Sequence, residues 1–130
     1  MVTAITARTR FTRLLADASA APNAQLFARD VLEEWGLGAL AEDACTGLDE
    51  LIGWVLANGS HVQVEITLVW DEDLALLFTE VVDHGEALPA EGDVPVSWCE
   101  DRGAERNWRG RVLWASYRTG RPQLLPGGAR

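Results

Sequence analysis

The sequence has no lysine, and it contains only two cysteines and two histidines among its 130 residues. Cys45 and Cys99 show no ligand-like spacing with each other or with the histidines, so neither a zinc site nor a disulfide framework is predicted. Positive charge is scarce overall. A net charge of -9 and a pI near 4.6 repel phosphate backbones. We therefore expect no nucleic-acid partner and no metal.

Long apolar runs are also missing. No stretch approaches the roughly 20 residues that span a bilayer, and the first residues lack the apolar core and cleavage signal of a secretory peptide. The length and the 48% hydrophobic content fit one globular domain. We expect a single cytoplasmic domain over residues 1–130, without membrane contact and with a loose tail from about residue 119. Arginine as the sole basic residue, with much alanine and glycine, is typical of high-GC bacterial genes.

The few positive charges are distributed unevenly. Residues 1–101 hold 4 arginines against 19 acids, whereas residues 102–130 hold 7 arginines against 1 acid. The arginines of the second segment either fold back onto the acidic body or meet an acidic partner. We favour the first interpretation.

The spacing of apolar residues predicts two helices in the first half of the chain. A short β-like piece at 11–15 comes first. Pro22 is expected to interrupt regular structure before Asn23 caps the first helix. Helical periodicity then covers 24–35 and again 40–59, and each pattern is stopped by glycine.

Alternating and continuous apolar patterns predict the strands. Residues 62–70 alternate with period two, and 74–82 are apolar on both faces, as in a central strand; the two should form an antiparallel hairpin. Residues 94–99 are expected to form a short strand, 101–107 to be irregular, and 111–117 to form the last strand. We predict an α/β (α+β) two-layer sandwich, with the helices on one face of a mostly antiparallel sheet.

Two phrases connect this plan to a known superfamily. Residues 34–37 read "EWGL" at the end of the first predicted helix, and residues 81–89 read "VVDHGEALP" at the end of the second long strand. Over roughly residues 11–90, the order of elements and these phrases resemble the Bergerat-fold, or histidine-kinase-like, ATPases. The superfamily includes gyrase, histidine kinases and anti-sigma-factor serine kinases. The resemblance is closest to the short bacterial serine-kinase type.

The family's helical Glu-Leu-Val-x-Asn motif supplies a glutamate that orients or activates water and an asparagine that binds Mg²⁺. The matching stretch here begins at Glu50 and places Trp54 at the asparagine position. Indole has no oxygen lone pair to offer Mg²⁺. The resemblance thus implies that metal binding is lost. We expect Trp54 to fill the former nucleotide cavity, with anchoring of a protein partner as the alternative, and Glu50 to be merely solvated.

The family's second motif is Asp-x-Gly-x-Gly, whose aspartate accepts a hydrogen bond from the adenine amino group. Asp83 and Gly85 keep its first half, which implies at most a weak, vestigial adenine site. An ordinary turn after a strand explains Asp83 equally well. The glycine-rich phosphate lid seen in the family is replaced by single glycines at 92, 103 and 110, so the lid is expected to be absent.

Three functional hypotheses follow. We favour a non-catalytic regulatory protein that binds no cofactor and acts on a protein partner, with a homodimer as a further option. The second is an ATP-dependent anti-sigma-factor-type serine kinase that uses ATP and Mg²⁺, with Glu50 as base and Asp83 holding adenine. The third is an unrelated small-molecule-binding or structural α+β domain, since fold alone does not settle function.

Overall fold

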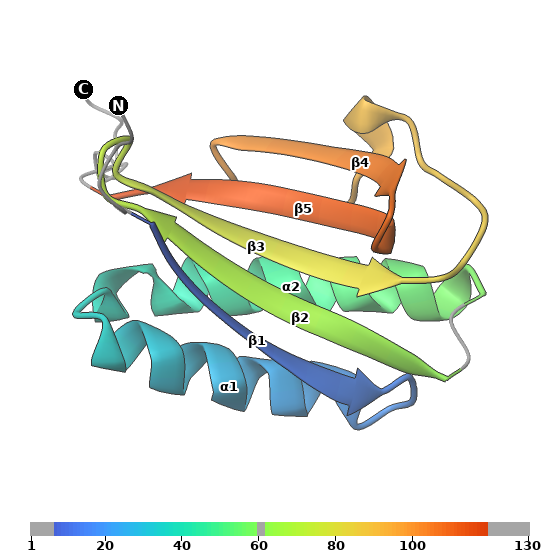
Figure 1. Ribbon diagram of the computed structural model, residues 1–130, viewed down its shortest axis with the longest axis horizontal. Helices are drawn as coiled ribbons and strands as arrows, with labels where there is room; N and C mark the ends of the chain where they lie inside the picture. Colours follow the sequence, from blue (N-terminus) through green and yellow to red (C-terminus); the bar gives the residue numbers. More distant parts are fainter. Residues whose placement is uncertain (1–6, 60–61, 120–130) are drawn as a thin grey trace, which may run out of the picture.

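Five strands form one antiparallel sheet in the order β1-β2-β3-β5-β4, and two helices cover one of its faces (Figure 1). This computed structural model describes residues 7–59 and 62–119. The strands are β1 (Ala7–Leu15), β2 (Gln63–Asp71), β3 (Leu76–Asp83), β4 (Asp101–Asn107) and β5 (Gly110–Arg118). The helices are α1 (Ala20–Glu34) and α2 (Ala41–Ala57), with short 3₁₀ turns η1 (Gly38–Leu40) and η2 (Glu91–Asp93). The predicted two-layer sandwich is confirmed.

Helix α1 begins earlier than the sequence suggested. The Asp17 carboxylate accepts hydrogen bonds from the Ser19 backbone N–H at 2.8 Å and from its hydroxyl at 2.5 Å, just before the helix starts at Ala20. The expectation that Pro22 interrupts regular structure was wrong, because the first turn of a helix needs no N–H from that position. Asn23 is not the cap either, since its N–H donates to Ser19 O at 3.1 Å inside the helix.

Both helices end where the glycine stops were predicted. Gly36 after α1 has φ +75° and Gly59 after α2 has φ +102°, which is the left-handed region that glycine enters without strain. Between these ends, the apolar stripes of α1 and α2 pack on the sheet. Fully buried core residues include Leu32, Leu48, Leu51, Ile52, Val55, Val64, Ile66, Leu68, Leu77, Val81, Leu113 and Tyr117. Burial at about 1.5–3 kcal/mol for each large apolar side chain drives this packing.

The long strands agree with the predicted patterns. Strands β2 and β3 form the expected antiparallel hairpin, and β3 lies at the centre of the sheet with β5 on its other side. Strand β5 also matches its prediction closely. Strand β1 is longer than expected: it pairs with β2 over nine residues and not only over 11–15.

The region between β3 and β5 was predicted incorrectly. Residues 94–99 form no strand; Val94 and Val96 are buried in a loop, and the Trp98 ring stacks on Tyr117 with centroids 6.3 Å apart. The polar segment assigned as irregular is strand β4, which pairs with β5 along its whole length. An edge strand has one free edge and keeps much of its surface in water, so its sequence carries little apolar periodicity.

The five described arginines of the C-terminal segment fold back onto the body of the domain, as the favoured interpretation expected. Three of them pair with acids: Arg109 with Glu65 and Glu80, Arg111 with Asp83, and Arg118 with Glu100. Arg102 and Arg106 donate to backbone carbonyls of the loop between β3 and β4. Arg121 and Arg130 lie outside the described residues. The predicted loose tail also falls outside them, apart from residue 119.

Candidate functional site

The most constrained polar group lies at the end of β3, on the face that the helices cover. Arg111 Nε donates to Asp83 Oδ1 at 2.7 Å, and Arg111 Nη2 donates to Asp83 Oδ2 at 2.6 Å. The two residues face each other in the β3–β5 register. Their side chains are 0% and 1% exposed. Such a two-bond pairing between a planar guanidinium and a carboxylate is strong and fixes both side chains.

The rest of the guanidinium is also engaged. Arg111 Nη1 donates to Ala87 O at 2.8 Å and to Asn58 O at 3.2 Å. Its Cζ lies 5.1 Å from the centroid of the Trp54 ring, within range of a cation–π contact. Arg111 thus joins the end of helix α2, the end of β3 and the loop after β3 into one buried cluster.

Glycine at position 85 makes this cluster possible. A Cβ on Gly85 would lie 2.2 Å from Arg111 Nη2 and 2.4 Å from Arg111 Cζ. The backbone of the loop after β3 therefore passes directly against the guanidinium. The two residues that the sequence singled out for an adenine site, Asp83 and Gly85, are brought together here, and both contact Arg111.

Trp54 lies on the α2 side of the same cluster. It is half-buried against the core, and Arg111 occupies the space between its ring and the Asp83 carboxylate. Asn58 closes the end of α2, because its Nδ2 donates to Trp54 O at 2.8 Å. The space beside the Asp83 carboxylate is therefore filled by the Arg111 guanidinium, which lies over the Trp54 indole, and not by the indole alone.

Glu50 has a role that the sequence did not suggest. Its Oε1 accepts from the Ser97 backbone N–H at 2.9 Å, and its Oε2 accepts from the Ser97 hydroxyl. The expectation of a merely solvated carboxylate was wrong: Glu50 fastens the loop at 94–99 onto helix α2. The contact joins residues that are 47 positions apart in the sequence, which local patterns cannot reveal.

Sequence reasoning missed Arg111 as a site residue. A signal existed, since an aspartate directly follows one predicted strand and an arginine begins another. Antiparallel neighbours bring such ends together. The pairing of β3 with β5 is not evident from the sequence, however, because β4 intervenes and residues 94–99 have the pattern of a strand.

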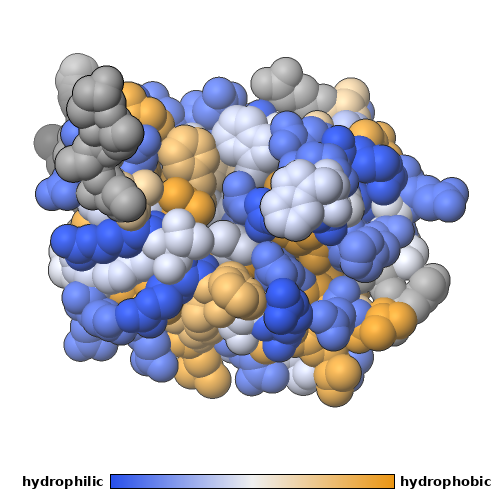
Figure 2. Space-filling model, viewed as in Figure 1, coloured by the Kyte–Doolittle hydropathy of each residue, from blue (hydrophilic) through white to orange (hydrophobic). Residues whose placement is uncertain are grey.

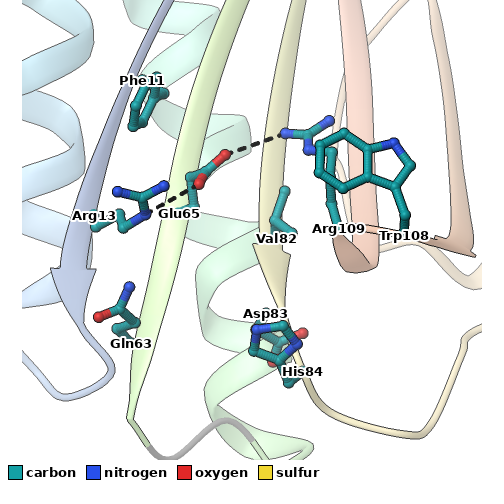
Figure 3. A pocket seen from close by; sticks show the side chains of 9 residues that line it. All are labelled: Phe11, Arg13, Gln63, Glu65, Val82, Asp83, His84, Trp108 and Arg109. Atoms are coloured by element: carbon teal, nitrogen blue, oxygen red, sulfur yellow. Dashed lines mark hydrogen bonds and ion pairs between the residues drawn. The ribbon is translucent and has the colours of Figure 1, made fainter.

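A second feature is a cavity of about 360 Å³ on the open face of the sheet. Figure 3 shows Arg13 and Arg109 on either side of Glu65 at this cavity; the Glu65 carboxylate pairs with both, at 3.3 and 3.4 Å. Trp108 and Phe11 contribute aromatic rings to the lining and are 92% and 53% exposed. Figure 2, which looks onto this face, shows apolar side chains separated by polar ones. The surface offers aromatic anchors, not a continuous apolar patch.

The histidines and cysteines form no further site within the described residues. His84 is exposed and lines the open-face cavity, whereas His61 lies outside the described residues. Within 7–59 and 62–119, no three His, Cys, Asp or Glu side chains gather as metal ligands would. Both cysteines are free, and burial raises the pKa of the Cys45 thiol. No described helix is long and apolar enough to cross a membrane.

Comparison with known proteins gives a likeness of fold. The sequence matches no protein-family model and no curated protein. Among solved structures, the chain is similar to the crystal structure of the RsbU and RsbW domains of Rv1364c from Mycobacterium tuberculosis, with a TM-score of 0.58 and 14% sequence identity. The match covers 85% of this chain and 32% of that one, so this chain spans about a third of its neighbour's length. At this level of identity the likeness concerns the fold alone.

Proposed function

We propose that this chain is a non-catalytic regulatory protein: a histidine-kinase-like ATPase domain that no longer binds nucleotide and acts by binding another protein. The observation that carries the proposal is the buried pair of Arg111 with Asp83. It lies where the resemblance puts the adenine-binding aspartate. The proposal extends to a cytoplasmic location, with which two free cysteines agree.

The Arg111 guanidinium occupies the place that the adenine ring of a nucleotide would need beside Asp83. Adenine would use its amino group to donate to the Asp83 carboxylate, and Arg111 already donates to both oxygens of that carboxylate. The guanidinium is planar and lies over Trp54, as a base would lie on an aromatic ring. Because the group is 0% exposed and hydrogen-bonded on several sides, a nucleotide would have to break a buried ion pair to enter.

The groups that bind Mg²⁺ and the phosphates in the family that this sequence resembles are also missing or engaged elsewhere. Trp54 offers only an N–H donor where Mg²⁺ needs oxygen. Glu50, the matching base, has both carboxylate oxygens engaged by Ser97. In place of a glycine-rich lid, the segment after Pro89 carries the short turn η2 and a loop that Glu50 fastens. These changes to the metal and phosphate sites are independent of the change at the adenine site, where Arg111 pairs with Asp83.

Protein binding is the remaining use for which the surface is suited. Trp108 at the tip of the β4–β5 hairpin is 92% exposed, and tryptophan is enriched among interface hot spots. The fold neighbour carries RsbU and RsbW domains, and the sequence resembles anti-sigma-factor kinases, which act on other proteins. We infer a protein partner that meets the open face of the sheet.

Calorimetric titration with ATP and Mg²⁺ tests the nucleotide half. We expect no saturable heat up to about 1 mM ligand, corresponding to a binding free energy weaker than about -4 kcal/mol. Micromolar binding would refute the proposal and revive the serine-kinase alternative. Incubation with labelled ATP and a candidate protein substrate then shows whether any phosphate is transferred.

Trp108→Ala tests the protein-binding half. Tagged wild type and variant are recovered from the cells that make the protein, and we expect a co-purifying protein to be lost with the variant. Trp108 is almost fully exposed, so its removal should leave the fold intact, which circular dichroism checks. A partner that is retained equally by Trp108→Ala and by the matched surface variant Leu74→Ala would contradict the assignment of the open face.

A further inference from the structure

The cavity on the open face of the sheet lies between two walls. Phe11 and Arg13 of β1 form one wall, and Trp108 and Arg109 at the β4–β5 turn form the other (Figure 3). Strands β2 and β3 lie between these walls in the sheet, so that Val82 of β3 forms part of the floor. The volume of about 360 Å³ falls near the lower end of the range for small-molecule sites, roughly 300–1,000 Å³. A cavity of this size suits one small ligand.

Two described carboxylates line the cavity, and both are already paired through both of their oxygens. Glu65 Oε1 pairs with Arg13 at 3.3 Å, and Glu65 Oε2 pairs with Arg109 at 3.4 Å. The Asp83 oxygens accept from Arg111 at 2.7 and 2.6 Å. A positively charged ligand would have to break one of these ion pairs to gain a carboxylate partner. The lining therefore disfavours a cation.

Hydrogen-bond donors of the lining, in contrast, remain free. Arg13 reaches Glu65 only through Nε, and neither of its Nη groups has an acceptor in the part of the chain that the structure describes. The Arg13 side chain is 58% exposed, and its Cζ lies 5.0 Å from the centroid of the Phe11 ring, which holds the guanidinium beside the cavity. The exposed Gln63 amide adds two further N–H donors. A ligand for this site is therefore one that accepts hydrogen bonds.

The charge around the cavity limits how negative such a ligand can be. Arg13 and Arg109 are balanced by Glu65 and Glu80 in one row of ion pairs across the sheet. The whole chain carries a net charge of -9, so its field opposes a dianion such as a phosphate ester more strongly than a monoanion. A carboxylate is a planar monoanion that matches the guanidinium fork with two parallel hydrogen bonds. A carboxylate thus fits this site better than a phosphate.

We propose that the cavity binds a small aromatic monocarboxylate. The carboxylate accepts hydrogen bonds from the free Nη groups of Arg13, and the ring packs on Val82 against the exposed indole of Trp108, a contact that aromatic rings favour. Because the ligand covers Trp108, it would compete with a protein partner on this face. That competition rests on the proposed function, whereas binding of the ligand to the chain alone needs neither a partner nor the absence of nucleotide binding.

Titration of the purified chain with benzoate, followed by two-dimensional proton–nitrogen NMR, tests the site without any partner. We expect saturable shifts of the Trp108 indole N–H and of the backbone amides of Arg13 and Gln63. The expected dissociation constant is about 1 mM or tighter, as good ligands of this size reach. Shifts that do not saturate by about 10 mM benzoate, or that saturate on the helix-covered face instead, would overturn the proposal.

Three analogues of benzoate with nearly the same outline test the charge of the ligand. Neutral benzamide and the dianion phenyl phosphate should bind at least about threefold more weakly than benzoate, and the cation benzamidine at least about tenfold more weakly. Benzamidine binding as tight as that of benzoate would show that only the ring is recognised. Tighter binding of phenyl phosphate would overturn the choice of a carboxylate.

A matched pair of variants tests the role of the guanidinium. Arg13→Gln removes the charged fork and should weaken benzoate binding at least about tenfold. Arg8 is exposed on the same strand and, an odd number of positions away, directs its side chain to the other face. Arg8→Gln makes the same change in net charge and should alter the dissociation constant by less than about twofold. Equal weakening by both variants would overturn the proposal, because only overall charge would then matter.

A third variant tests the opposite wall of the cavity and leaves every arginine in place. Trp108→Ala should weaken benzoate binding at least about threefold through loss of the ring contact. Because Trp108 is 92% exposed, its thermal midpoint should equal that of the wild type. Unchanged benzoate binding by a folded Trp108→Ala would contradict the placement of the ring.

Discussion

Arg109 and Arg111 are two residues apart and lie on opposite faces of the sheet. On the open face, Arg109 donates to Glu80 at 2.9 Å and to Thr67 at 3.2 Å, and its side chain remains 24% exposed. On the covered face, Arg111 is 0% exposed and is held by Asp83. Both arginines have carboxylate partners, but the ion pairs of Arg109 are partly solvated and the ion pair of Arg111 is buried. Water can replace the contacts of Arg109, but nothing can replace those of Arg111.

The separation of the two side chains depends on the hairpin turn. Residues of the same parity on a regular strand point to the same face, so Arg109 and Arg111 would share one if β5 simply continued. Between them lies Gly110 with φ +126°, a conformation that other residues rarely adopt. A Cβ there would also lie 2.3 Å from Asp83 O. The turn sends Arg109 to the open face and leaves Arg111 to the interior.

The largest difference between the two sites should appear when their acids are removed. Asp83→Ala leaves a buried, unpaired guanidinium, and we expect the free energy of unfolding to fall by about 3–5 kcal/mol. Glu80→Ala on the open face should lower it by less than about 1 kcal/mol. Urea denaturation followed by tryptophan fluorescence measures both.

The cause of the Asp83 effect can be separated from simple loss of packing. In the double variant Asp83→Leu with Arg111→Met, no charge remains buried, and most of the lost stability should return. If the double variant is as unstable as Asp83→Ala, the damage comes from lost shape complementarity and the contrast between the two faces is not electrostatic.

A middle-sized effect is expected from filling the space beside the buried arginine. Gly85→Ala puts a methyl group 2.2 Å from Arg111 Nη2, and the guanidinium cannot move without breaking its bonds to Asp83. Overpacking of this kind lowers stability by about 1–3 kcal/mol. Thermal unfolding is the measurement.

Gly53→Ala is the matched control for that substitution. Gly53 lies within helix α2 with nothing within 4 Å of an added Cβ, so alanine should stabilise the helix by about 0.5–1 kcal/mol. Opposite signs for the two glycines are expected. A neutral Gly85→Ala would mean that Arg111 is less tightly held than its contacts indicate.

The smallest effect belongs to Arg109→Ala. Its ion pairs with Glu65 and Glu80 are partly solvated, so the expected loss is about 0.2–1 kcal/mol, and it should shrink as salt is added. Unfolding midpoints of wild type and variant at low and high ionic strength give the comparison. A loss as large as that of Asp83→Ala would erase the distinction between the faces.

Predictability from the sequence varied along the chain for physical reasons. Helix α2 and strands β2, β3 and β5 were predicted well, because half-buried or buried elements repeat apolar residues at their own period. Strand β4 and the start of α1 were missed. The pairing of β4 depends on β5, and the position of α1 depends on the Asp17–Ser19 turn, so neither has a local apolar signal.

For the candidate site, the sequence by itself determined the chemical types present: an indole at position 54, where the resemblance implies a metal ligand, and an aspartate and a glycine at the end of β3. Only the tertiary structure decided what meets them, because strand order brought Arg111 opposite Asp83 and packed both beneath α2. Hydrophobic periodicity is a property of short segments. The pairing of a buried charge is a property of the whole fold, set by which distant strand becomes the neighbour.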